Sequence, residues 1–437
     1  MAIKVAKFGG SSLADVEQFK KVKEIITSDP ERRYIVPSAP GKRHSGDSKI
    51  TDMLYECARL AQAQKDFSEV FKQISLRYFE IQYGLGLETD IDERLIEISE
   101  NIQQGFGPDY AASRGEYLNG ILLAAYLGFA FIDAEDVICI HANGKPDLEK
   151  TAEICEIALK DVEYAVIPGF YGSCAGKIKT FSRGGSDISG AIVANAVHAD
   201  LYENWTDVPG FLMADPRIVN NPEIIRELTF RELRELSYMG ATVLHEESIF
   251  PVREAKIPIN VKNTNDPSQK GTLIHPERAS SGNMGAITGI AGRKGFSVFL
   301  IEKPMMNAEL GFVRRALSLL ESMGISFEHM PSGIDTLSLV ICDDQLNGKE
   351  QQLIEKLKIT CDTEHVVLYS NMALIATVGQ GMQRSVGVSG KLFGALANEG
   401  INVRMIDQGS SELNIIIGVE TDDFEKAVQA IYKAFVE

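Results

Sequence analysis

Four segments of the chain combine glycine with charged or hydroxyl side chains, the residue types that bind phosphate and carboxylate groups. They are Lys7–Ser12 (KFGGSS), Ser113–Glu116 (SRGE), Arg183–Asp187 (RGGSD) and Trp205–Gly210 (WTDVPG), which continues to Ala214–Arg217 (ADPR). No sequence of the form G-x-x-x-x-G-K-[ST] is present. None of the four segments is therefore a P-loop.

The first segment places Lys7 at the end of an expected strand, Ile3–Phe8, with Gly9 and Gly10 in the turn that leads into a helix. Glycines there let backbone N–H groups approach a phosphate, and the lysine can lie over a phosphoryl group during transfer. As a strand-end residue, Lys7 is expected to be exposed. A tight strand-to-helix turn without a ligand explains the same residues about equally well.

The RGGSD segment precedes an expected helix, Ile188–His198. Arg183 supplies a cation, the two glycines expose backbone amides, and Asp187 supplies a carboxylate, all within a short stretch. Ser186 or Asp187 could also cap the helix, and capping is compatible with a functional role. The combination favours an anion-binding site.

The other two segments are weaker when taken alone. Trp205–Gly210 contains turn residues and is expected to form a loop at the carboxyl end of a strand, where α/β sheets bind ligands. Ser113–Glu116 is expected to open a helix that continues through Leu118–Ala125, with Glu116 in its first turn. The helix dipole favours a carboxylate there, so a structural role explains Glu116 by itself.

Strands and helices alternate through the first part of the chain, with a helical pattern over residues 51–104. Strands are expected at Ile3–Phe8, Tyr34–Val36, Ala130–Ile132, Ala165–Pro168 and Ile257–Val261. This alternation predicts an α/β sandwich with a mainly parallel sheet.

The last third of the chain repeats itself. Gly311 aligns with Gly387, 76 positions later, and no gap is needed through the next two dozen residues. Strands are expected at Ser297–Ile301 and Leu337–Cys342 in one copy, and at Ala373–Val378 and Leu413–Val419 in the other. Two small α+β modules are therefore expected, after a linker near Pro276–Asn283.

Composition limits the class of protein. The 437 residues favour two or three domains, and the formal net charge of −17 disfavours nucleic acid or an anionic membrane as a partner. No apolar run is long enough for a membrane span. The six cysteines lie far apart, without a C-x-x-C pair, which favours reduced thiols in a cytoplasmic protein.

Together the motifs resemble those of the aspartate kinases, in the order found in that family. The set is KFGGSS, Ser38-Ala39 followed by Ile50-Thr51-Asp52, SRGE, RGGSD, WTDVPG with ADPR, and Met239–His245 (MGATVLH). The resemblance covers essentially the whole chain, which is too short to carry an appended homoserine dehydrogenase. It implies an amino-acid-kinase-like αβα sandwich over residues 1–280. It also implies a regulatory region over 281–437, with two ferredoxin-like ACT modules at about 287–365 and 366–437 that could be interleaved.

The resemblance implies ATP-dependent phosphorylation of the side-chain carboxylate of L-aspartate to 4-phospho-L-aspartate, with Mg²⁺. This reaction begins the biosynthesis of lysine, threonine and methionine. The implied roles are as follows: Lys7, Gly9 and Gly10 at the ATP phosphates; Asp187 beside Lys7 and the reacting groups; Thr51, Glu116, Arg183 and Ser186 at aspartate, with Glu116 at its ammonium and Arg183 at a carboxylate; and Thr206, Asp207 and Arg217 at the nucleotide.

Two departures from the family pattern concern the adenine side of the site. An aromatic residue that the family often has shortly after TDVPG is shifted or replaced in this chain, which has Phe211-Leu212 there. Thr242 stands where a lysine is common. The motifs also contain no His or Cys that could act as a general base. A carboxylate acceptor is already anionic at neutral pH, so the reaction needs positioning and charge neutralisation instead.

The ACT modules imply feedback inhibition by lysine or threonine, in a homodimer or larger assembly formed through these modules. The expected effector residues in the first copy are Met306, Glu309, Phe312 and Glu328. The two carboxylates would suit a lysine side chain, which is the reason for preferring lysine.

Two other functions stay open. One is another amino-acid kinase, such as one that acts on glutamate. The other is a non-catalytic amino-acid sensor, in which the ACT modules bind a ligand and the first domain is only a scaffold. The joint presence of Lys7, Arg183 and Asp187 argues against the sensor.

Overall fold

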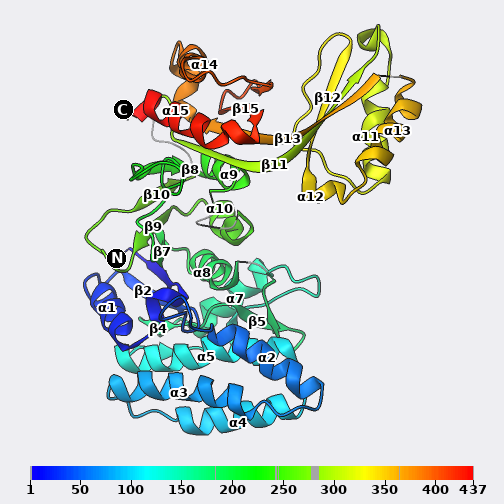
Figure 1. Ribbon diagram of the computed structural model, residues 1–437. Helices are drawn as coiled ribbons and strands as arrows, with labels where there is room; N and C mark the ends of the chain where they lie inside the picture. Colours follow the sequence, from blue (N-terminus) through cyan, green and yellow to red (C-terminus); the bar gives the residue numbers. More distant parts are fainter. Residues whose placement is uncertain are drawn as a thin grey trace. The chain divides into compact units, whose positions relative to one another are not determined.

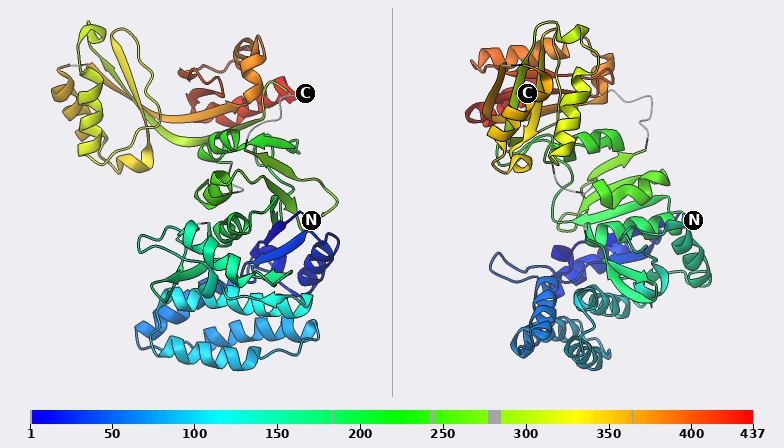
Figure 2. Two further views of the ribbon diagram at one scale, coloured as in Figure 1. Left: turned by 180° about the vertical axis from the view of Figure 1, so that it is seen from behind. Right: turned by 90° about the vertical axis from the view of Figure 1, so that its right-hand side faces the viewer.

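A computed structural model describes residues 2–182, 184–241, 244, 246–276, 285–363 and 365–436. The chain forms two compact units. The first unit comprises Met1–Phe211, Arg226–Phe230 and Thr242–Arg278, and the second comprises Leu212–Ile225, Arg231–Ala241 and Ala279–Glu437. Figures 1 and 2 show each unit from several sides. The division of the chain near residue 280 stays a prediction.

The first unit is built on an eight-stranded sheet in the order β3-β4-β2-β1-β7-β9-β10-β8. The strands are β1 (Lys4–Phe8), β2 (Arg32–Pro37), β3 (Ala130–Phe131), β4 (Ala165–Val166), β7 (Leu201–Thr206), β8 (Glu227–Thr229), β9 (Ile259–Asn263) and β10 (Thr272–His275). Neighbouring strands run parallel except β9 and β10. The carboxyl ends of β1, β2, β4 and β7 therefore share one edge of the sheet.

Helices cover both faces of this sheet (Figure 1). One face, with Phe8, Ile35 and Trp205, packs in a single core with five helices. These are α1 (Val16–Thr27), α2 (Ile50–Gln62), α3 (Ser68–Gly84), α4 (Ile91–Gln103) and α5 (Pro108–Leu127). The opposite face is covered by α8 (Gly185–Ala196), against which α7 (Leu148–Ala158) packs.

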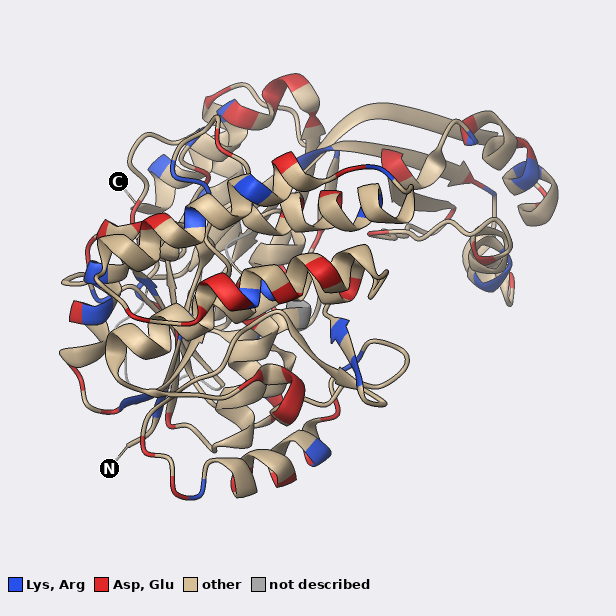
Figure 3. Cartoon of the chain, turned by 90° about the horizontal axis from the view of Figure 1, so that it is seen from below, with Lys and Arg blue, Asp and Glu red and all other residues tan. Residues whose placement is uncertain are grey.

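Shorter elements complete the first unit. They are η1 (Gly10–Leu13), α6 (Ala134–Val137), β5 (Tyr171–Cys174), β6 (Lys177–Thr180), η2 (Glu246–Ile249) and α10 (Phe250–Glu254). Among the described residues no helix is long and apolar enough to cross a bilayer. Seen from below, Asp and Glu alternate with Lys and Arg along the helices that face the viewer (Figure 3).

The second unit contains a five-stranded antiparallel sheet in the order β12-β11-β13-β15-β14. Its strands are β11 (Gly289–Glu302), β12 (Thr336–Cys342), β13 (His365–Val378), β14 (Met405–Asp407) and β15 (Asn414–Glu420). The helices are α9 (Phe230–Tyr238), α11 (Phe312–Ser322), α12 (Asp343–Leu346), α13 (Glu350–Cys361), α14 (Val388–Asn398) and α15 (Phe424–Val436), with the short turns η3 (Met306–Ala308), η4 (Gln380–Arg384) and η5 (Thr421–Asp423).

Two 14-residue strands, β11 and β13, run through both modules (Figure 1). The end of β11 and the start of β13 share a core with α11 and α13. The start of β11 and the end of β13 share another core with α14 and α15. Each module therefore takes one half of each long strand. The core of the first module comes from one continuous stretch, residues 299–368, whereas the second module takes its strands from before and after that stretch.

The repeat that the sequence indicates is visible in the backbone. The helices α11 and α14 begin 76 positions apart, and each follows a glycine in the left-handed region, Gly311 with φ 79° and Gly387 with φ 88°. A side chain with a Cβ is strained at such a φ. The predicted αβα sandwich with a mainly parallel sheet and the two α+β modules are confirmed.

Candidate active site

The side chains of Lys7 and Asp187 meet at the carboxyl edge of the sheet. The Nζ atom of Lys7 lies 2.5 Å from Oδ1 of Asp187, and the amide of Asn204 donates a 2.8 Å hydrogen bond to the same oxygen. Lys7 and Asn204 are register partners on β1 and β7, so their side chains lie on the same face, beneath α8. This covering leaves Lys7 only 7% exposed, so the expectation that Lys7 is exposed is wrong.

The start of α8 is set by its glycines. Gly184 occupies the position before the helix with φ 73°, and no side chain caps the first turn. Asp187 lies in that turn, but its carboxylate is directed to Lys7 and Asn204 rather than to the helix backbone. Ser186 is buried against Gly169, where a Cβ would lie 2.5 Å from the Cβ of Ser186.

Gly41, in the loop after β2, packs closely against the turn after β1. The N–H group of Gly9 donates to the carbonyl of Trp205 at 3.0 Å, and that of Gly41 donates to the carbonyl of Gly10 at 2.8 Å. A Cβ at Gly41 would lie 2.5 Å from the carbonyl carbon of Gly10. Only glycine therefore fits at position 41, and no sequence motif drew attention to it.

Glu116 lies in the middle of α5, and the prediction that SRGE opens this helix is wrong. The helix begins at Pro108, after Gly107 with φ 94°, and proline is favoured at a first helical position. The dipole argument for Glu116 therefore fails. The helix comes close to the end of β2 at Gly115, where a Cβ would lie 2.9 Å from the Cβ of Ala39.

The carboxylate of Glu116 is buried and incompletely paired. The backbone N–H of Ala39 donates to it, while no described residue donates to its Oε2 atom. Burial raises the pKa of Glu116 to about 8, against an ordinary value of 4.5, although the Ala39 hydrogen bond acts in the opposite direction. A cationic ligand group beside Oε2 would relieve this cost.

Asn119 lies one turn further along α5. Its amide donates to the carbonyl of Ser38 at 2.6 Å, and its Oδ1 atom is buried without a partner in the described part of the chain. Sequence analysis missed both Asn119 and Asn204. The first lies outside the SRGE motif, and the second directly precedes the WTDVPG motif, in a strand that the sequence analysis did not delimit.

The other predicted residues are less tightly joined to this centre. Thr51 is half-buried at the second position of α2, which packs against α5. Thr206 ends β7, and its hydroxyl donates to Asp207 at 3.2 Å on the exposed rim. Arg217 belongs to the second unit and pairs with Asp215 at 2.6 Å. Arg183 and Thr242 lie outside the described residues.

The expected effector residues lie in the first module of the second unit. Met306 and Phe312 are buried in its core. Glu309 pairs with Lys303 at 2.8 Å and with Arg315. Glu328 pairs with Arg293 at 3.1 Å and accepts a hydrogen bond from the hydroxyl of Tyr238. Both carboxylates therefore already have cationic partners within the chain.

Comparisons with known proteins agree with this architecture. The model of the amino acid kinase family matches residues 2–263, and that of an ACT domain matches residues 375–435. Aspartokinase 3 of Bacillus subtilis is 39% identical, over 99% of this chain and 98% of that protein. The crystal structure of Clostridium acetobutylicum aspartate kinase is 56% identical with a TM-score of 0.91, over 100% of both chains.

A more distant structure, E. coli aspartokinase III in complex with aspartate and ADP, is 27% identical with a TM-score of 0.75, over 100% of both chains. The fold and the matches first define a class, a kinase of amino acids that carries ACT modules. Within that class, the chain belongs to the aspartokinases of the amino acid kinase family. The predicted resemblance is confirmed.

Proposed function

We propose that the chain transfers a phosphoryl group from ATP to the side-chain carboxylate of L-aspartate, forming 4-phospho-L-aspartate. The observation that carries this proposal is the pairing of a buried, half-satisfied carboxylate with a buried lysine at one sheet edge. Glu116 has a free acceptor, Oε2, for an ammonium group, and Lys7 supplies positive charge for a phosphate. The aspartokinase relatives support the same substrate.

In this proposal Glu116 holds the ammonium of aspartate, and Thr51, Ser186 and Arg183 complete its binding site. The side-chain carboxylate of aspartate is an anion at neutral pH, so no residue has to remove a proton before it attacks. Catalysis then consists of bringing two anions together and stabilising the charge of the transferring group.

The nucleotide phosphates are assigned to the turn at Gly9 and Gly10. A Cβ at Gly10 would lie 3.0 Å from the carbonyl oxygen of Ala39, so glycine at this position lets the turn pack against the loop after β2. The backbone amides of such a glycine turn can approach a phosphate closely. Lys7 and the uncapped first turn of α8 add positive potential. Thr206, Asp207 and Arg217 are assigned to the rest of the nucleotide.

We assign Mg²⁺ to the nucleotide rather than to a protein site of its own. Among the described residues no group of three or more His, Cys, Asp or Glu side chains is placed to hold a metal ion. The ion would neutralise phosphate charge, and Asp187 is the carboxylate nearest to Lys7 that could face it. The six free cysteines support the predicted cytoplasmic location.

The test of the reaction is to trap the acyl phosphate with hydroxylamine. Purified full-length protein with ATP and Mg²⁺ is given aspartate or glutamate in parallel. Hydroxamate from aspartate alone is expected. Hydroxamate mainly from glutamate would assign another amino-acid kinase, and none from either substrate would favour the non-catalytic sensor.

We further propose feedback inhibition by lysine or threonine through the ACT modules of a homodimer or larger assembly. A structure of E. coli aspartokinase III was solved with lysine and aspartate, which supports lysine as the first choice. Glu309 and Glu328 are already paired in this chain. An effector cation would therefore have to share these carboxylates with Lys303 and Arg293, or displace those side chains from them.

The regulatory proposal is tested by titrating lysine, threonine and both together against the initial rate, with wild-type protein and Glu328→Ala. Inhibition is expected, together with reciprocal weakening of effector and aspartate binding. Inhibition by neither amino acid would contradict regulation. Lysine inhibition that Glu328→Ala leaves unchanged would contradict only the site.

A further inference from the structure

The loop between β2 and α2 joins the two halves of the proposed active site. It runs over residues 38–49, passes beside the glycine turn at Gly41, and leads directly into Ile50 and Thr51 at the start of α2. No side chain caps the first turn of α2. Whatever fixes this loop therefore also fixes the packing against Gly10 and the entry into the helix that carries Thr51.

The carboxylate of Asp47 is the centre of this loop. It accepts hydrogen bonds from the backbone N–H and the Nε of Arg43, each at 3.0 Å, and from the backbone N–H of Ser48 at 3.1 Å. It also accepts a 2.6 Å charge-assisted bond from Nη2 of Arg77. These donors hold the pKa of Asp47 well below its ordinary value.

Arg77 links two separate points of the loop, Gly41 and Asp47, to α3. While Nη2 binds Asp47, Nη1 donates to the carbonyl of Gly41 at 3.1 Å. The Arg77 side chain is only 4% exposed, so its position is set by packing as well as by charge. A single guanidinium fork thus ties the Gly41 carbonyl to a carboxylate six positions later in the same loop.

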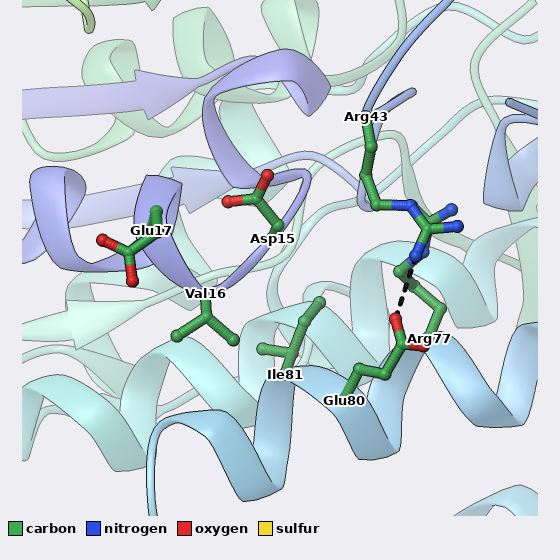
Figure 4. A pocket seen from close by; sticks show the side chains of 7 residues that line it. All are labelled: Asp15, Val16, Glu17, Arg43, Arg77, Glu80 and Ile81. Carbon is green, nitrogen blue, oxygen red and sulfur yellow. Dashed lines mark hydrogen bonds and ion pairs between the residues drawn. The ribbon is translucent and has the colours of Figure 1, made fainter. Parts of the chain in front are cut away.

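A small cavity of about 140 Å³ lies beside this cluster, lined by residues of α1, α3 and the loop (Figure 4). Arg43 reaches into it from the loop, and its Nη1 lies 2.9 Å from Glu80 of α3. Asp15 and Glu17 line the same cavity from α1. Arg43 is thus a second, more exposed tie between the loop and α3, whereas Arg77 is the buried one.

We propose that Asp47 and Arg77 are positioning residues that hold Gly41 against Gly10 and the start of α2 in register with the glycine turn. Neither side chain touches a substrate in this proposal. They act through the Gly41 N–H bond to the Gly10 carbonyl, in a contact where a Cβ at Gly41 does not fit. The proposal rests on the assignment of Gly10 to the ATP phosphates.

The test compares Asp47→Asn, Arg77→Lys and the double variant in full-length protein. Asparagine keeps the shape of Asp47 but loses its charge, and lysine cannot form the two-pronged contact of Arg77. Each single variant is expected to raise KM for ATP and the dissociation constant for ADP by about tenfold, because small displacements of positioning groups are costly. The double variant should be little worse than either single variant, since both break one cluster.

Asp90→Asn is the matched control, because it breaks an aspartate–arginine pair at the start of α4 (Asp90 with Arg94, 2.9 Å) away from the loop. It should leave KM and ADP binding unchanged. Gly41→Ala disturbs the same contact without changing charge and should also raise KM for ATP. If Asp47→Asn does not fold, Gly41→Ala still tests whether the contact between Gly41 and Gly10 affects ATP binding.

Wild-type KM and ADP affinity in folded Asp47→Asn and Gly41→Ala would overturn the proposal, as would a lowered melting temperature without any kinetic change. Lys7→Ala is measured in the same assay. If Lys7→Ala retains wild-type turnover, the site assignment itself has failed. If Lys7→Ala is inactive and the loop variants behave as wild type, only the positioning role has failed.

Discussion

Two buried ion pairs lie on opposite faces of the eight-stranded sheet. On the α8 face, Lys7 of β1 pairs with Asp187 beside Asn204 of β7. On the other face, Arg32 of β2 pairs with Glu203 of β7 at 2.6 Å. Both pairs lie at the centre of the sheet, around β1, yet they differ in how completely their polar atoms are satisfied.

The Arg32–Glu203 pair is closed. Arg32 also donates to the carbonyl of Ile25 at 2.5 Å and lies over the ring of Trp205, whose Nε1 donates to Glu203 at 2.9 Å. The side chains of Arg32 and Glu203 are 8% and 4% exposed. Neither Arg32 nor Glu203 has a buried polar atom without a partner among the described residues, so we interpret this pair as structural.

The Lys7–Asp187 pair is open. The Asp187 side chain is 20% exposed. Glu116 and Asn119 of α5, which bond to the backbone just after β2, each have a buried oxygen that no described residue satisfies. Unsatisfied buried polar atoms cost stability. The difference teaches that charge and burial alone do not mark a functional site, whereas incomplete pairing at a sheet edge does.

The largest effect is expected for Lys7→Ala. This variant removes a preorganised cation, which commonly lowers kcat on the order of 10²- to 10³-fold. The melting temperature should fall only modestly, because Asp187 keeps its bond from Asn204 and some access to water. Steady-state kinetics and thermal unfolding check this. A kcat near that of wild type would mean that the Lys7–Asp187 pair, like the Arg32–Glu203 pair, is only structural.

The converse prediction concerns Glu203→Gln. Removing one partner of a closed, buried pair leaves Arg32 with only its longer contact to Asp29, at 3.8 Å. The expected cost is about 3 kcal/mol in the free energy of unfolding. Turnover per folded molecule should stay near the wild-type value. Chemical denaturation, with activity corrected for the folded fraction, measures both. A large loss of kcat in stably folded protein would show that this pair also serves the reaction.

Glu116→Gln tests the unsatisfied carboxylate. The variant should raise KM for aspartate by about 10- to 100-fold, the range for losing a hydrogen bond to a charged group. KM for ATP should change little, because the glycine turn and Lys7 are intact. An increase confined to ATP would show that Glu116 does not hold the amino-acid substrate.

Sequence patterns found the residues whose local context is distinctive. Lys7, Gly9 and Asp187 stand at strand–helix junctions next to glycines, so their grouping followed from the geometry of a parallel sheet. The start of α5 was also readable, because Gly107-Pro108 is a typical helix start. The helix start was instead predicted at the motif Ser113–Glu116, which lies within α5.

Other features depend on contacts between distant segments. Asn204 and Gly41 became significant only when β7 and the loop after β2 were placed beside β1. In the second unit the repeat was predicted, but the division of β11 and β13 between two cores depends on strand pairing across the modules. A one-dimensional pattern does not contain that information.

The smallest predicted effect is a pH dependence that follows from Glu116. Its pKa is raised to about 8 by burial, so much of the unliganded protein carries a neutral Glu116 at pH 7. An ammonium ligand prefers the ionised form. Aspartate binding should therefore tighten as the pH rises towards 8, by at most about tenfold per pH unit, and level off above it. KM for aspartate measured from pH 6.5 to 9 checks this.

Stability should change in the opposite direction. A carboxyl group whose pKa is higher in the folded state binds its proton more tightly there. Its contribution to stability is complete below the ordinary pKa of 4.5 and is lost as the pH rises through 8. Unliganded wild-type protein should therefore lose stability over this window relative to Glu116→Gln, and saturating aspartate should restore it. If the two proteins without aspartate show parallel pH profiles of thermal unfolding, Glu116 is already paired. The site around Lys7 and Glu116 would then be as fully satisfied as the Arg32–Glu203 pair.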